Sequence, residues 1–308
     1  MSLTMTENFN ELVDVAMQQP GRTAMRPVVE KEILHYDIFY ALDAAGLLKD
    51  LVFQGGTSLR LCRGSSRFSE DLDFAGGRDF TSQKMEAIKA CIEKHLGARY
   101  GLVVEVKEPK EMATLPDYEN VRVDKWQVSV ETSPEQRDMP RQRIKLEIAN
   151  IPAYTSELVP LRQNYDFLLG YGQVLVIAES IDEILADKVV AFPASVKNIR
   201  YRDIWDIAWL QQQGAKLDPS LVERKIEDYH IEDYAQLLED AISRLPDLID
   251  GKPFVEQMTR FIDADTLART LREPKFAEYL KNTVGQVFNS MAAHLNEALN
   301  KAGHGFKM

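Results

Sequence analysis

The residues best suited to chemistry gather in one segment, residues 55–74, which joins a glycine pair to two aspartates. Apolar residues just before it predict a short strand that leads into Gly55 and Gly56. Thr57 or Ser58 is then expected to cap a short helix, whose unpaired backbone N–H groups and positive end suit a phosphate. The sequence therefore predicts a phosphate-binding loop at this point.

Asp71 and Asp73 lie at the other end of this segment, after a turn at residues 64–66. The residues around them predict a strand, and successive side chains of a strand point to opposite faces. Both carboxylates should therefore share one face, while Leu72 points into the core. Carboxylates beside a phosphate-binding loop indicate a site for a metal ion and a nucleotide.

The segment resembles the AbiEii/AbiGii family of nucleotidyltransferase toxins, within the DNA polymerase β-like superfamily. The shared runs are Gly-Gly-Thr-x-Leu at residues 55–59 and Arg-Phe-Ser-x-Asp-Leu-Asp-Phe at residues 67–74. The resemblance extends over most of the first two hundred residues, and none is seen beyond about residue 215.

Two later segments add to this resemblance. Residues 184–191 match a second family motif at Lys188, and residues 200–207 match a third motif that contains Asp203 and Asp206. A lysine can hold the phosphates of a nucleoside triphosphate as a point charge. A nearby aspartate can orient that lysine or accept a proton from the attacking hydroxyl. We expect Asp203 to serve the site, with Asp206 as the alternative.

Residues 143–148 alternate charged with apolar side chains, which predicts a strand with Lys145 and Glu147 on one face. The family resemblance implies a third carboxylate from a later strand, and Glu147 is the best candidate for this metal ligand. The alternative is a solvated strand face on which Lys145 simply neutralises Glu147.

The resemblance implies transfer of a nucleoside monophosphate from a nucleoside triphosphate (NTP) to an acceptor hydroxyl, with release of pyrophosphate. Two Mg²⁺ ions held by Asp71 and Asp73 would clamp the attacking and leaving oxygens. Lys188 would neutralise the triphosphate, and Asp203 would be the helper acid or base. The expected nucleotide-binding residues are Gly55, Gly56, Thr57, Ser58, Arg67, Ser69 and Lys188.

The resemblance also implies a toxin of a toxin–antitoxin or phage-defence pair, with a cognate antitoxin, whose relatives modify the 3′ end of tRNA. Two other functions remain open. The enzyme could nucleotidylate a protein or a small molecule, which would fit weak basic character around the site. The domain could instead bind a nucleotide without catalysis, which would fit a missing carboxylate or lysine.

The composition is that of an ordinary globular protein, with 308 residues, 45% hydrophobic residues and a net charge of −11. No apolar run is long enough for a transmembrane helix, and Cys62 and Cys91 form no metal-binding or disulfide pattern, so we expect a cytoplasmic protein. An acidic chain needs a local basic patch to bind RNA. The candidates are Arg137, Arg141, Arg143 and Lys145 in one group, and Lys197, Arg200 and Arg202 in another.

The length favours two domains. We expect an α+β architecture, in which a polymerase β-like nucleotidyltransferase domain at residues 1–160 contains a mixed sheet with helices. A mainly helical domain at residues 161–308 should follow and complete the active-site cleft. Residues 154–173 are expected to be an irregular linker, and helices are expected at 6–17, 27–45, 82–96, 179–192, 219–228, 231–245, 253–271 and 276–301.

Overall fold

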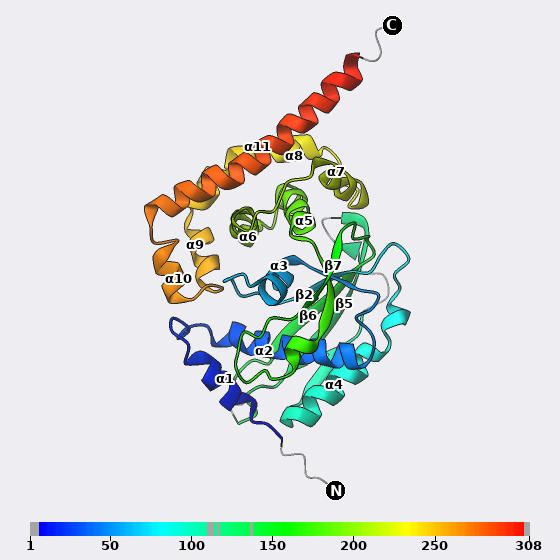
Figure 1. The fold of residues 1–308 in the computed structure, drawn as a ribbon, viewed down its shortest axis with the longest axis vertical. Helices are drawn as coiled ribbons and strands as arrows, with labels where there is room; N and C mark the ends of the chain where they lie inside the picture. Colours follow the sequence, from blue (N-terminus) through cyan, green and yellow to red (C-terminus); the bar gives the residue numbers. More distant parts are fainter. Residues whose placement is uncertain (1–5, 110–113, 116–117, 136–137, 305–308) are drawn as a thin grey trace. The chain divides into compact units, whose positions relative to one another are not determined.

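The computed structural model describes residues 6–109, 114–115, 118–135 and 138–304 (Figure 1). The chain forms two compact units. The first contains residues 1–115, 121–179 and 260–266, and the second contains residues 116–120, 180–259 and 267–308.

A mixed sheet forms the centre of the first unit, with strand order β3-β5-β6-β2-β1-β8-β7 and β4 paired to β5. The pairs β2–β6 and β1–β8 are parallel, whereas β1–β2, β3–β5, β5–β6 and β7–β8 are antiparallel. The strands are β1 Val52–Gln54, β2 Leu72–Ala75, β3 Val104–Lys107, β4 Thr114–Leu115, β5 Tyr118–Val130, β6 Gln142–Ala149, β7 Ser156–Pro160 and β8 Leu175–Glu179.

Helices α2 and α4 pack together on one face of this sheet (Figure 1). Phe53 of β1 and Phe74 of β2 point toward α2, where their rings and that of Phe39 lie within 6.0 Å of one another. This packing turns the alternate residues of β1 and β2 to the opposite face of the sheet. The helices of this unit are α1 Phe9–Met17, α2 Arg26–Ala44, α3 Gly55–Ser58 and α4 Ala87–Tyr100, with a π-helical turn at Leu59–Arg63 and 3₁₀ turns at Ser82–Met85 and Tyr171–Gln173.

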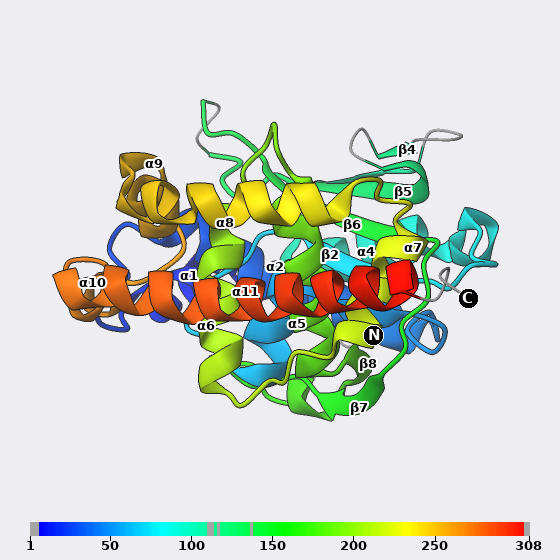
Figure 2. The same cartoon turned by 90° about the horizontal axis from the view of Figure 1, so that it is seen from above.

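Apart from the start of β5, the regular elements described in the second unit are helices, and α8 and α11 lie side by side in both views (Figures 1 and 2). As expected, Ser180 caps the first helix of this unit by accepting a hydrogen bond from the Glu183 backbone N–H at 3.2 Å. The helices are α5 Ile181–Ala194, α6 Tyr201–Gln212, α7 Pro219–Asp228, α8 Tyr234–Asp250, α9 Lys252–Thr259, α10 Ala264–Arg269 and α11 Pro274–His304. The expected fold class, a mixed sheet with helices followed by a helical region, is confirmed.

The chain leaves the first unit at residue 179, later than the expected boundary at residue 160. The expectation of a linker at 154–173 is wrong, because β7 lies in this stretch and pairs with β8. Apolar residues are sparse on β7, an edge strand with mostly exposed side chains, so the sequence carried little strand signal there.

One expected helix, 253–271, is divided into α9 and α10 by a segment that belongs to the first unit. The Phe261 carbonyl accepts a hydrogen bond from the Phe68 backbone N–H at 2.7 Å, and the Ala264 backbone N–H donates to Gly21 at 2.9 Å. The expected end of α4 at Gly97 is also wrong, because the helix continues to Tyr100 and ends at Gly101, whose φ is +67°. Among the described residues, no helix has both the length and the apolar character that crossing a membrane requires.

Candidate active site

A row of polar side chains crosses one face of the sheet in the first unit. Gln54 pairs with Asp73, Asp73 with Glu147, and Glu147 with Lys125, on the adjacent strands β1, β2, β6 and β5. Residues paired in this way project their side chains to the same face. The register therefore makes Asp73 and Glu147 neighbours, as the resemblance to polymerase β-like transferases implied.

Asp71 lies directly before β2 and is held by Lys145. Its Oδ1 accepts a hydrogen bond from the Lys145 backbone N–H at 3.1 Å, and its Oδ2 lies 3.7 Å from the Lys145 ammonium. The Thr57 hydroxyl donates to the Asp71 backbone carbonyl, which ties this residue to α3. Leu72 is buried in the core, as the alternation predicted.

Glu147 forms its ion pair with Lys125, with 3.1 Å between the ammonium and the carboxylate. The alternative in which Lys145 neutralises Glu147 is wrong, because Lys145 pairs with Asp71 on the other side. The sequence pattern could not distinguish these pairs, since cross-strand neighbours depend on strand order.

The glycine pair brings the loop close to the carboxylates. Gly55 has a φ of +76°, and a Cβ on it would lie 2.9 Å from Oδ2 of Asp73. A Cβ on Gly56 would collide with the guanidinium of Arg67, which is 2% exposed and donates to the Phe68 carbonyl at 2.8 Å. Neither glycine therefore has room for a larger side chain.

The expected helix cap at Thr57 or Ser58 is wrong. The residue before α3 is Gln54, which makes no side-chain capping bond, and both hydroxyl residues lie buried inside the helix. Backbone groups, rather than these hydroxyls, are therefore the groups of the loop that suit a phosphate. The chain continues into the π-helical turn Leu59–Arg63, a distortion that occurs often at functional sites.

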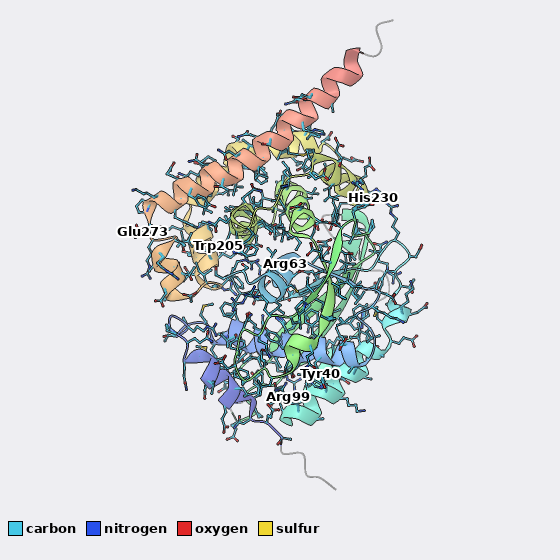
Figure 3. All side chains as sticks on the ribbon, viewed as in Figure 1. Tyr40, Arg63, Arg99, Trp205, His230 and Glu273 are labelled. Carbon is cyan, nitrogen blue, oxygen red and sulfur yellow. The ribbon has the colours of Figure 1, made fainter. Side chains whose placement is uncertain are left out.

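Arg63 ends this turn (Figure 3). It pairs with Glu157 of β7 at 2.7 Å and donates to the Glu179 carbonyl at 3.2 Å. These contacts tie the loop to the edge of the sheet formed by β7 and β8.

In the second unit, Lys188 of α5 is 4% exposed and contacts both candidate aspartates of α6. Its ammonium lies 2.7 Å from a carboxylate oxygen of Asp203 and 2.7 Å from one of Asp206. Asp203 also pairs with Arg200 at 2.5 Å. Although burial raises the pKa of Asp203, the charges of Arg200 and Lys188 hold that pKa well below its usual range. The contacts of Lys188 therefore do not distinguish Asp203 from Asp206, because its ammonium pairs with both.

A second buried lysine, Lys225 of α7, was missed by the sequence reading. It is fully buried and pairs with Glu183 at 2.7 Å and with Asp187 at 3.1 Å, both on α5. Glu183 and Asp187 are four residues apart and share a helix face. This acidic pair, close to Lys188 in the sequence, could have predicted that a second cation packs against this face of α5.

The basic residues considered for RNA binding are partly engaged within the chain. Arg141 pairs with Glu131 at 3.0 Å, Lys145 with Asp71 and Arg200 with Asp203. Arg143 and Lys197 are exposed, Arg202 is half-buried, and Arg137 lies outside the described residues.

Within the part of the chain that the structure describes, no group of three or more His, Cys, Asp and Glu side chains is gathered closely enough to hold a metal ion. The donors nonetheless suit Mg²⁺ chemically, because Mg²⁺ prefers oxygen and uses one or two carboxylates together with substrate phosphates. Asp71 and Asp73, with Glu147 beside them, supply this kind of incomplete oxygen set.

The chain matches a known protein family over most of its length. A family model described as "Nucleotidyl transferase AbiEii toxin, Type IV TA system" matches residues 37–282. The chain belongs to the AbiEii family. It is therefore a nucleotidyltransferase of the toxin type found in type IV toxin–antitoxin systems. The match continues well beyond residue 215, where the sequence reading saw no resemblance, and reaches into α11.

One solved structure, MenT4, shares the fold of this chain. The nucleotidyltransferase toxin MenT4 from Mycobacterium tuberculosis is 19% identical with a TM-score of 0.54, covering 96% of this chain and 97% of that chain. JHP933 from Helicobacter pylori is 19% identical with a TM-score of 0.44, covering 90% of this chain and 95% of that chain. No match is found among curated proteins.

Proposed function

We propose that this AbiEii-family enzyme transfers a nucleoside monophosphate from an NTP to an acceptor hydroxyl, and that Asp71 and Asp73 are its metal-binding carboxylates. The observation that carries the proposal is the position of Asp73, which lies between the backbone of Gly55 and the side chain of Glu147. This arrangement puts a phosphate-binding loop and an acidic row side by side on one rigid sheet.

Asp71, Asp73 and Glu147 would hold Mg²⁺, which when bound supplies charge to the attacking and leaving oxygens. The backbone N–H groups of the Gly55–Gly56 loop would hold phosphates. The buried Arg67 and Ser69 lie against Gly56 and would shape the loop. A Cβ added to Gly56 would lie 3.2 Å from the Ser69 hydroxyl. Thr57 and Ser58 would support it from inside the helix.

Lys188 and Asp203 are proposed to serve the same reaction. The charge of Lys188 is already matched by two buried aspartates, so binding of a triphosphate would exchange one of these pairs for phosphate. A carboxyl whose pKa is held low is a weak base. We therefore propose that Asp203 orients Lys188, and that Asp203 is not the group that accepts the proton.

The proposed acceptor is the 3′ end of tRNA, which the enzyme would meet in the cytoplasm, and family membership implies a cognate antitoxin. A protein or small-molecule acceptor is the second candidate. It is favoured by the pairing of Arg141, Lys145 and Arg200 within an acidic chain, which leaves fewer basic groups for RNA phosphates. Binding without catalysis fits poorly, because every carboxylate and lysine of the motifs is present.

The test is to incubate the protein with total tRNA, cell protein, Mg²⁺ and each labelled NTP in turn. Asp73→Ala should lower label transfer by roughly 100-fold or more, because losing a metal ligand removes several kcal/mol of transition-state stabilisation. Asp79→Ala, at an exposed aspartate of the next loop, is the matched control and should remain active. Label in protein rather than RNA would refute the tRNA acceptor, and equal transfer by the Asp73 variant would refute the site.

A further inference from the structure

The carboxylates of the proposed site carry an electrostatic problem that the sheet itself creates. Asp73 and Glu147 face each other across the parallel pair β2–β6, and Asp71 lies two residues before Asp73. Like charges directly opposite on neighbouring strands are destabilising. The facing carboxylates of Asp73 and Glu147, with Asp71 two residues before Asp73, therefore need cations even when no substrate is present.

Two lysines of the same sheet supply those cations. Lys145 contacts both carboxylate oxygens of Asp71: its backbone N–H donates a hydrogen bond to Oδ1, and its ammonium lies 3.7 Å from Oδ2. Lys125 contacts Glu147 from the next strand. In the register of β2, β6 and β5, the two acidic side chains Asp73 and Glu147 are followed across the face by the basic Lys125, with the pair Asp71 and Lys145 beside them.

Both contacts are of a kind that another cation can displace. The ammonium of Lys145 lies 3.7 Å from Asp71, and the side chains of Lys145 and Lys125 are 55% and 40% exposed. Ion pairs this exposed to water contribute little to stability, so releasing them costs little. By contrast, the ammonium groups of Lys188 and Lys225 in the second unit are buried.

We propose that Lys145 and Lys125 are resident counter-cations of the active-site carboxylates. They hold Asp71 and Glu147 in place before metal binds, and a divalent ion must displace them to reach the carboxylates. They thereby weaken the affinity of the site for metal and keep it dependent on the phosphates that arrive with the nucleotide. This inference rests on the proposed metal-binding role of Asp71 and Asp73.

The experiment is a titration of the full-length protein with Mn²⁺ alone, in which electron paramagnetic resonance counts the free ion. Lys145→Met and Lys125→Met should each bind Mn²⁺ about two- to fivefold more tightly than the unmodified protein, the range expected for loss of an exposed ion pair. Lys145→Arg retains the charge and should bind as the unmodified protein does. In EDTA, the two Met variants should melt at a slightly lower temperature than the unmodified protein, and adding Mn²⁺ should restore their melting temperature.

Lys107→Met is the matched control for a general change of charge. Lys107 is exposed on β3 and pairs with Gln127, which separates it from Lys145. With strands about 4.8 Å apart, it lies farther from Asp71 than the roughly 8 Å over which exposed charges act at physiological salt. Its removal should therefore leave Mn²⁺ binding nearly unchanged.

Asp73→Ala separates this inference from the function on which it rests. If Mn²⁺ binding needs Asp73 but Lys145→Met and Lys125→Met behave like Lys107→Met, the counter-cation role is refuted and the metal site stands. If binding does not need Asp73, both the counter-cation role and the metal role of this carboxylate are refuted. Tighter binding that requires Asp73 and is confined to Lys125 and Lys145 supports the inference.

Discussion

Buried histidine at position 35 shows how a single side chain links α2 to the carboxylate strand. Its Nε2 donates a hydrogen bond to the Glu70 carbonyl at 3.0 Å, directly before Asp71. Burial lowers the pKa of His35 to about 4, so the ring is neutral in the folded protein at neutral pH. The neutral His35 ring thus holds the Glu70 backbone carbonyl, which directly precedes Asp71.

This gives the first unit a pH dependence with a definite sign. Between the unfolded pKa near 6.5 and the folded value of about 4, the unfolded chain binds more protons, so stability falls as the pH is lowered. The loss should approach about 3 kcal/mol across this window. In His35→Gln, denaturant unfolding at pH 7 and pH 4.5 should show a smaller difference than in the unmodified protein. An equal difference in both proteins would contradict the prediction.

Among the elements, α2 and α4 are joined through one buried carboxylate. Asp37 of α2 is fully buried and accepts hydrogen bonds from Arg99 at 2.6 Å, Tyr100 at 2.7 Å and Tyr171 at 2.6 Å. Arg99 and the exposed Tyr40, both labelled in Figure 3, each contact the ring of Tyr171. The helix pair that supports the back of the sheet therefore depends on a single acidic group.

Asp37→Ala should lower the free energy of unfolding by about 3–5 kcal/mol, because it leaves the buried hydroxyls of Tyr100 and Tyr171 without this acceptor and removes one of the two carboxylates that pair with Arg99. Asp43→Ala, on the exposed side of the same helix, is the control and should change stability by no more than about 0.5 kcal/mol. Chemical denaturation followed by circular dichroism compares the two. Similar small losses in both variants would show that Asp37 is not a structural centre.

The contact between α5 and α7 gives a second prediction at this scale. Lys225→Met leaves the buried Glu183 and the half-buried Asp187 without this cation, and should destabilise the second unit by about 3–5 kcal/mol. Adding Glu183→Gln and Asp187→Asn should recover part of this loss, because no uncompensated charge remains. Lys252→Met, at an exposed lysine of α9, should have little effect. Failure of the triple variant to exceed the single variant in stability would contradict a charge-based explanation.

For the whole molecule, membership of a toxin family predicts an effect on the cell. Induced expression should slow growth, and Lys188→Ala should relieve this slowing if Lys188 serves the reaction. Lys252→Ala removes an exposed lysine of α9 and should slow growth as the unmodified protein does. Growth curves at matched protein levels, with thermal melting to verify folding, provide the measurement. Equal slowing by all three proteins would count against Lys188.

Local patterns were sufficient for much of the fold. Apolar spacing and capping residues predicted α2, α5 and α7 nearly to their ends, because each helix buries a stripe along its own length. They were insufficient for β7, whose exposed edge has no apolar face to reveal it. They also misjudged the stretch 253–271, where backbone hydrogen bonds to residues far away in the chain interrupt a helical pattern.

The amino-acid sequence by itself predicted the candidate groups: the glycine pair, Asp73 on β2 with Asp71 directly before that strand, and the motifs that carry Lys188 and Asp203. Their types and short-range spacing follow from strand and helix periods alone. Tertiary structure decided the pairings, since Glu147 meets Asp73 only through the parallel register of β2 and β6. Strand order decided that Lys125, and not Lys145, pairs with Glu147. Helix packing decided that Lys225 of α7 pairs with Glu183 and Asp187 of α5. Such contacts join residues distant in sequence, so no local period encodes them.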